Sequence, residues 1–366
     1  MRVALLALAV ALAAIGCAGH GDRPASTAWD PEAARLFEAA ERAVEAGDYA
    51  QGRALMEQAA ATGEPDAING LALYVGRGIG ADPDRQRGRE LLEQAVDAGS
   101  VAAKVNLGNE LLRSSDRKDQ RRGVALLQGV YARPPEGERG AGLRMLAAGG
   151  LAPAYLFGIG VEEDIPRGVD LLEQADASRE APAEVLYLLG RTYDSGWGGR
   201  ERDALKSHLY FVRAAQMDHA PSQWYVGMSM LNESGAEHDE REAYRWVRRS
   251  GEAGFLNGEL STAVMLALGQ GVAEDDVEAR TWYERAAKKN SAHGLRGLGF
   301  MLLTGEGGPR DPARGFAYLQ LAAEGGDEEA VKGAASYRSE LSDEELAAAD
   351  EIARQWLAEH GKPNPD

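Results

Sequence analysis

The sequence predicts an all-α protein built from repeated pairs of amphipathic helices. Alanine- and leucine-rich periodic segments dominate the chain, and the Val and Ile runs that would indicate strands are scarce. Glycine-rich turns recur in "YVGRGIGADPD", "TYDSGWGGRERD", "MLALGQGVAEDD" and "LLTGEGGPRDPARG". The units between these turns have a constant length, which is typical of one continuous stack of repeats rather than of separate domains.

The repeat has a period of 36 residues. Successive units begin at positions that register without a gap, and the residues at these starts are Gly63 and Gly99, then Asp218, Gly254, Asn290 and Gly326. Gly, Asn and Asp tolerate the left-handed backbone conformation that ends many helices. The sequence therefore predicts that each unit ends its second helix at such a residue.

Each unit is expected to contain a helix A and a helix B. Helix A carries a small residue after a hydrophobic one, as in Leu298-Gly299. A glycine inside a helix costs about 1 kcal/mol relative to alanine, so its recurrence predicts that helix B approaches closely there. An Asp or Pro then opens helix B, as at Asp311-Pro312.

These residues resemble the Sel1-like repeats, a subclass of the tetratricopeptide-type α-solenoids. The family pattern A-x-x-x-L-G-x-x-Y-x-x-G-x-G-V-x-x-D, followed by A-x-x-W-Y-x-x-A-A, is matched best at residues 256–290. The resemblance implies a right-handed α-solenoid of Sel1-like or TPR-like helix pairs over residues 31–341, with about eight units. It also implies a protein that binds other proteins.

The quality of the repeat varies along the chain. The first pair looks more like a general tetratricopeptide unit, and residues 100–180 are expected to hold two degenerate units in which Pro134, Pro135 and Pro153 interrupt helices. Residues 342–361 predict a C-terminal capping helix, with Ser342 as its N-cap and Glu345 three residues later.

The N-terminus predicts an exported, lipid-anchored protein. Residues 1–16 carry one basic residue and then an uncharged run too short to span a membrane comfortably, as in a signal peptide. Ala14-Ile15-Gly16-Cys17 resembles a bacterial lipobox, which implies lipidation of Cys17, and residues 17–30 would form the lipidated cysteine and a flexible tether. Ala18 implies sorting to the periplasmic face of the outer membrane. An ordinary signal peptide that contains a cysteine is the alternative.

The charge of the chain limits its partners. The formal net charge is −18 at pH 7, which makes nucleic acid an unsuitable partner. A local basic cluster of Arg117, Lys118, Arg121 and Arg122 is interpreted as a solvated helix face, although it could still act within a Debye length of about 8 Å.

No catalytic, cofactor-binding or metal-binding residues are predicted. The glycine-rich turns lack the strand, the Lys and the Ser or Thr of a phosphate loop. His208 and His219 would need a geometry that the repeat gives no reason to expect. The acidic runs at residues 162–164 and 274–276 both fall where helix B begins, and acids are favoured there by the helix dipole.

The aromatic residues provide the candidate contact sites. Trp246, Trp282 and Tyr318 share one repeat position and are expected in the core between helix pairs. Trp197 lies in a turn and Trp224 near the start of a helix A, so these two tryptophans are the candidate protein-contact residues.

Together these features predict a lipid-anchored, non-catalytic adaptor that binds outer-membrane or periplasmic proteins through the solenoid surface. Resemblance to lipid-anchored repeat proteins that assist exopolysaccharide secretion implies an alginate-type export scaffold. The alternative is a hydrolase of β-lactams or cell-wall fragments, because some cysteine-rich Sel1-like proteins are credited with that activity. Those relatives carry a cysteine pair in each repeat, and this chain has no cysteine after Cys17.

Overall fold

The computed structural model describes residues 29–177, 181–231 and 239–365. These residues form 18 α-helices and two single-turn 3-10 helices, and they contain no strand. The all-α solenoid expected from the sequence is confirmed. The predicted signal peptide, Cys17 and most of the predicted tether lie outside the described residues.

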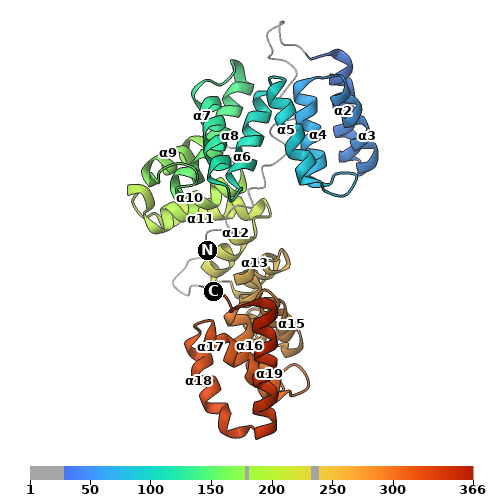
Figure 1. The fold of residues 1–366 in the computed structure, drawn as a ribbon. Coiled ribbons are helices and arrows are strands. Elements are labelled where there is room, and N and C mark those ends of the chain that lie inside the picture. Colours follow the sequence, from blue (N-terminus) through green and yellow to red (C-terminus); the bar gives the residue numbers. More distant parts are fainter. Residues whose placement is uncertain (1–28, 178–180, 232–238, 366) are drawn as a thin grey trace. The chain divides into compact units, whose positions relative to one another are not determined.

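The helices follow one another as A and B partners (Figure 1). The pairs are α2 (Pro31–Glu45) and α3 (Tyr49–Ala61), α4 (Pro65–Arg77) and α5 (Arg85–Asp97), α6 (Val101–Leu112) and α7 (Arg117–Ala132), α8 (Gly137–Phe157) and α9 (Ile165–Asp176), α10 (Ala183–Ser195) and α11 (Ala204–Gln216), α12 (Ala220–Met230) and α13 (Glu240–Glu252), α14 (Leu256–Leu268) and α15 (Asp276–Lys288), α16 (Ala292–Thr304) and α17 (Pro312–Glu324), and α18 (Glu328–Tyr337) and α19 (Asp343–His360). The 3-10 helices are η3 (Trp197–Gly199) and η4 (Arg338–Glu340).

The chain divides into two compact units, and the boundary falls between Ser207 and His208. Within each unit a helix contacts chiefly its neighbours in the chain, and some A helices also touch the next A helix, as α6 touches α8 and α12 touches α14. The core of each unit lies between the A and B helices, and it is made mainly of Ala and Leu side chains. Contacts between sequence neighbours are what a stack of repeats requires.

The unit boundaries have the predicted backbone conformation. Asp218 and Asn290 both have φ of 61°, and Gly254 and Gly326 also have positive φ. The next residue then caps helix A in each case. Helix A also approaches helix B at its glycine, because a Cβ at Gly299 would lie 2.9 Å from the carbonyl oxygen of Gly315. Both predictions are confirmed.

The glycines of the A-to-B turns connect consecutive repeats. Gly271 has φ of 71°, and a Cβ there would overlap with the carbonyl oxygen of Glu240, in the first turn of the preceding helix B. Gly307 has the same relation to Asp276. The close contact explains the repeated glycine, because the turn of one repeat rests directly on the backbone of the previous one.

The prediction that Pro153 interrupts a helix is wrong. Pro134 and Pro135 do lie between α7 and α8, but Pro153 is inside α8, which continues to Phe157. Proline removes one helical hydrogen bond and crowds the carbonyl four residues earlier. Here the whole segment around Pro153 is buried, so packing against α6 and α9 outweighs the local cost. This long helix also accounts for the stretched repeat between residues 100 and 180.

The last helix has the predicted cap. The Ser342 side chain accepts a hydrogen bond from the Glu345 N–H, and the Glu345 carboxylate accepts one from the Ser342 N–H, which together form a capping box.

Of the aromatic residues expected in the core, Trp282 and Tyr318 are buried, whereas Trp246 is half-buried.

The C-terminal tail is held against the start of α16. The Asn290 amide donates to the carbonyl oxygens of His360 and Lys362 at 3.1 Å each, and Trp356 donates its indole N–H to Asn290 Oδ1 at 2.9 Å. The backbone N–H of Asn364 donates to the Asn290 carbonyl at 2.8 Å. These bonds fix the capping helix α19 to the preceding repeat.

Candidate protein-interaction surface

The second unit exposes apolar side chains on its A helices. Met228 on α12, Val264 on α14 and Phe300 on α16 occupy the same position in three consecutive repeats, each 36 residues from the next. Leu260 and Leu268 extend the apolar row along α14. Phe300 is half-buried and packs against Tyr337, so we call the apolar stripe the set Met228, Leu260, Val264 and Leu268.

The stripe faces solvent because the other sides of its helices are occupied. α14 packs between α13 and α15, and it buries Ala263, Met265 and Leu266 in the core. Leu260, Val264 and Leu268 are spaced four residues apart, so they lie along one side of the helix. Val264 remains 42% exposed and Leu268 70% exposed. Single exposed apolar residues are common, but an adjacent set of them indicates a binding surface.

Trp224 joins the two A helices beneath this stripe. Its indole N–H donates to Ser261 Oγ on α14 at 2.9 Å, and its ring meets that of Phe255 edge to face at 6.1 Å. The tryptophan is half-buried rather than fully exposed. The structure thus places one of the two candidate contact residues among exposed apolar neighbours, and its contact with a partner stays a prediction.

Trp197, the other candidate, lies in η3 in the first unit. It is half-buried, and its ring centroid is 5.8 Å from that of Phe157 at an angle of 56°. The nearest exposed large apolar side chain in the sequence is Leu205, eight residues later. The contact role of Trp197 also stays a prediction.

Met228, Val264 and Leu268 were not predicted as contact residues. Only Trp197 and Trp224 were predicted as contact residues from the sequence. The usable signal was the spacing: Val264 and Leu268 continue a four-residue series from Leu260, whereas the core of α14 already contains Ala263, Met265 and Leu266. One helix cannot bury two full stripes against the same neighbours.

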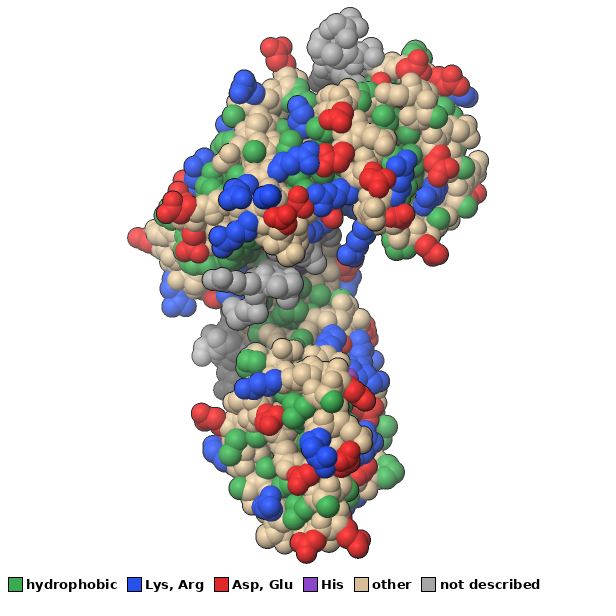
Figure 2. Space-filling view, in the orientation of Figure 1, with side chains coloured by type: hydrophobic (Ala, Val, Ile, Leu, Met, Phe, Trp, Pro, Cys, Tyr) green, Lys and Arg blue, Asp and Glu red, His purple; other side chains and the backbone are tan. Residues whose placement is uncertain are grey.

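Hydrophobic side chains reach the surface of the second unit among charged ones (Figure 2). One carboxylate beneath this surface is buried: Glu259 on α14 is 1% exposed and pairs with Arg285 at 3.2 Å and Lys289 at 2.8 Å. The equivalent position holds Ile68, Leu186 or Leu295 in three other A helices, and Lys104 or Gln223 in two more. Arg285 in α15 and Lys289 at its end compensate the buried charge of Glu259.

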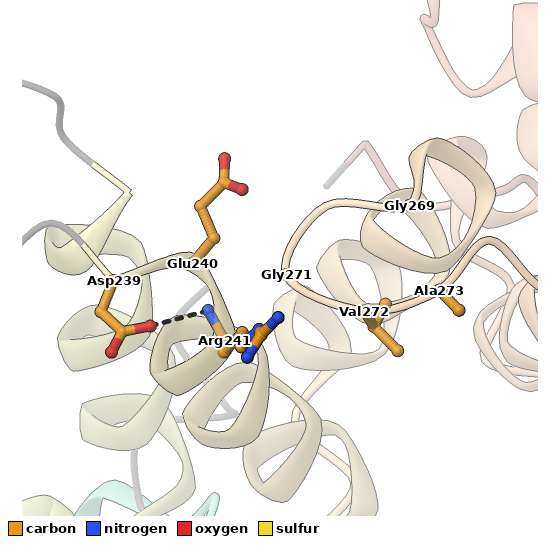
Figure 3. Close-up of a pocket in the computed structure, with 7 residues that line it drawn as sticks. All are labelled: Asp239, Glu240, Arg241, Gly269, Gly271, Val272 and Ala273. Atoms are coloured by element: carbon orange, nitrogen blue, oxygen red, sulfur yellow. Dashed lines mark hydrogen bonds between the residues drawn. The ribbon is translucent and has the colours of Figure 1, made fainter.

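A depression of about 630 Å³ lies where the turn after α14 meets the start of α13. Its lining runs from Asp239 to Arg241 and from Gly269 to Ala273 (Figure 3). The Asp239 carboxylate accepts from the backbone N–H of Arg241 at 2.9 Å, so it caps the helix. A second depression contains the acidic run at residues 162–164. Both depressions lie at A-to-B turns.

The acidic runs are helix caps, as predicted. Asp164 accepts from the Arg167 N–H at 3.1 Å, and Asp275 from the Glu278 N–H at 2.9 Å. His219 also caps a helix, and its ring nitrogen accepts from the Ser222 N–H at 3.3 Å.

Within the described parts of the chain, no group of three His, Cys, Asp or Glu side chains could hold a metal ion. No helix of these parts has the length and hydropathy of a membrane span.

The fold and the exposed stripe define an α-helical repeat protein with a surface suited to protein binding. A family model described as Sel1 repeat matches residues 65–100, 146–175, 183–219, 220–255, 259–291 and 292–327, more than half of the chain. The chain belongs to the Sel1 repeat family. Sel1 repeat proteins generally bind protein partners.

Individual relatives are more distant. Sel1-repeat-containing protein YjcO of Escherichia coli K12 is 31% identical over 100 residues, which cover 26% of this chain and 43% of YjcO. The matched segment thus spans less than half of that relative. A Sel1 repeat protein from Oxalobacter formigenes has a similar structure, with a TM-score of 0.52 and 19% identity over 82% of this chain and 85% of that one. This likeness supports the fold alone.

Proposed function

We propose that this protein is a non-catalytic adaptor that binds a protein partner through the apolar stripe of its second unit. The observation that carries the proposal is the exposure of Met228, Val264 and Leu268 on adjacent A helices, in register with the repeat. Protein interfaces have an apolar centre in which a few large side chains provide most of the binding energy. Trp224 is held rigidly beneath the stripe, which limits the entropy lost on binding.

The proposed location is the periplasmic face of the outer membrane, with attachment through a lipidated Cys17. Support comes from the apolar run that ends in Ala14-Ile15-Gly16-Cys17 and from Ala18. Two or more acyl chains give durable attachment where one gives only marginal binding. A scaffold for exopolysaccharide secretion, as in alginate export, is the pathway that this combination of anchor and repeats favours. No observation on the described residues favours the hydrolase, so it is not proposed.

The attachment is tested by Cys17→Ser. We expect the wild type to fractionate with membranes, and the variant to be released or to retain its signal peptide. Unchanged fractionation together with unchanged N-terminal processing would contradict the lipid anchor.

The binding surface is tested by crosslinking in intact cells followed by affinity capture. The variant Val264→Lys/Leu268→Lys places two charges in the stripe, and Val277→Lys/Val331→Lys is the matched control because these valines are 66% and 52% exposed outside it. A partner that the wild type and the control capture, and that the stripe variant loses, supports the proposal. Equal capture by all three proteins would exclude the stripe.

A further inference from the structure

Basic side chains cluster at the A-to-B turns of the second and third helix pairs, in the first unit. Arg77 ends α4 and Arg113 caps α6, while the remaining members lie at the starts of α5 and α7. We call the basic rim the set Arg77, Arg85, Arg113, Arg117, Lys118 and Arg121. Lys and Arg side chains gather over the α5–α8 part of this unit in Figure 2.

Ion pairs between the two B helices bring the starts of α5 and α7 side by side. Arg89 on α5 pairs with Asp119 on α7 at 3.0 Å, and Arg122 on α7 pairs with Glu93 on α5 at 2.5 Å. The hydrogen bond from Arg89 holds the pKa of Asp119 below its usual value. These two ion pairs neutralise the carboxylates of Asp119 and Glu93 between α5 and α7.

Within the rim Arg113 pairs with Glu110 at 3.2 Å, whereas three other cations keep their charge exposed. Asp84 and Asp116 are occupied as N-caps, since they accept from the backbone N–H groups of Arg87 and Lys118. Arg117, Lys118 and Arg121 are exposed, and they form no ion pair with any described residue. The following A-to-B turn carries Glu162 and Glu163 instead of cations.

This arrangement is unfavourable for the isolated protein. Cations in the first turn of a helix oppose the helix dipole, at a cost of about 0.3–1 kcal/mol each. Burial lowers the pKa of Arg77, and the positive charge of Arg113 lowers it further. An external anion at the exposed first turn of α7 would offset the unfavourable interaction with the helix dipole, so the interpretation of residues 117–122 as only a solvated helix face is incomplete.

We propose that the basic rim docks on anionic phospholipid headgroups and thereby orients the molecule on a membrane. The inference rests on the membrane attachment proposed above. A cluster of four to eight Lys and Arg side chains is the usual recognition element for anionic lipid surfaces. With a net charge of −18, acidic faces of the chain are repelled by such a surface, whereas the rim is attracted to it. A lipid anchor and a basic patch together give stable attachment.

An acidic protein partner is less suited to the rim. Among the described residues of the first unit, the exposed large apolar side chains are Tyr49 and Leu205, and neither belongs to the rim. Protein interfaces depend on a desolvated apolar centre, whereas a headgroup plane requires only exposed cations.

The test is co-sedimentation with phosphatidylcholine vesicles, with and without phosphatidylglycerol, using the full chain with Cys17→Ser so that no acyl anchor contributes. The rim variant is Arg117→Glu/Lys118→Glu/Arg121→Glu. The matched control, Arg241→Glu/Lys288→Glu/Arg338→Glu, changes the net charge equally at exposed positions in the second unit. The rim variant adds acids at a helix start and should keep α7 folded, which circular dichroism verifies.

We expect wild type and control to bind only the vesicles that contain phosphatidylglycerol. The rim variant should partition at least about tenfold less at low ionic strength. Equal binding by rim variant and control, or equal binding to both kinds of vesicle, would overturn the proposal. So would binding of a decaglutamate peptide without vesicle binding, which would assign the rim to an acidic polypeptide. None of these outcomes depends on the apolar stripe, so the two proposals fail separately.

Discussion

Two B helices, α5 in the first unit and α15 in the second, begin with the same cap and opposite charges. In the first unit Asp84 caps α5 through the Arg87 N–H at 2.9 Å, and in the second Asp275 caps α15 through the Glu278 N–H at 2.9 Å. After the cap, α5 continues with "RQRGR" and α15 with "DVEAR". The cap alone is sufficient for the turn, so the charge of the first helical turn is free to serve recognition.

The A helices differ in a second way. In the first unit neighbouring A helices are linked by polar contacts, mostly at buried positions: Asn106 donates to Asn69 at 2.8 Å, and Asp66 accepts from Ser100 and pairs with Arg139. In the second unit two A helices carry the exposed apolar stripe. A satisfied polar network has few groups left for a partner, whereas exposed apolar surface gains free energy when it is covered. The comparison favours the second unit as the place of the protein binding that we propose.

The largest effect is expected at the turns, which both units share. Gly271→Ala and Gly160→Ala place a Cβ against the backbone of the preceding helix B at positive φ. We expect each to lower the free energy of unfolding by about 2–4 kcal/mol, from backbone strain and overpacking together. Gly99→Ala is the control, since it has positive φ but open space, and should cost about 1 kcal/mol. Urea unfolding measures all three, and equal costs would show that turn docking is unimportant.

A smaller effect is expected from the buried carboxylates that differ between the units. Glu259→Ala removes the partner of Arg285 and Lys289, but both cations are 40% exposed and can turn to water. The loss should be about 1–3 kcal/mol. Asp66→Ala should cost a similar amount, because Ser100 and Arg139 lose an acceptor. Arg87→Ala, at an exposed pair, should cost less than about 1 kcal/mol. A loss at Glu259 no larger than that at Arg87 would contradict the role of the buried pair.

The smallest effect concerns the first helical turns. Arg117→Glu should stabilise the first unit by about 0.3–1 kcal/mol, and Asp276→Lys should destabilise the second by a similar amount, because only the sign relative to the helix dipole changes. Thermal unfolding at low salt measures both shifts, and high salt should reduce them. Shifts of the same sign would show that the first-turn charges act through other contacts.

Most of the fold could be predicted because each repeat uses the same kinds of helix cap, turn glycine and left-handed residue. The left-handed residues at Asp218 and Asn290, the cap at Ser342 and the turn glycines each follow from local backbone chemistry. Pro153 was misjudged because its cost is local, whereas the burial that outweighs it comes from distant residues. The apolar stripe was missed for the same reason: Val264 and Met265 are adjacent and both apolar, and only packing shows which of them is covered.

The central claim is that the apolar stripe binds the partner. The most direct measurement is the dissociation constant of the captured partner, determined by calorimetry for the wild type, Val264→Lys/Leu268→Lys and the Val277→Lys/Val331→Lys control. We predict that the stripe variant raises the dissociation constant at least about tenfold, while the control changes it less than about twofold. A stripe variant that binds as tightly as the wild type, with an unchanged melting curve, would contradict the claim.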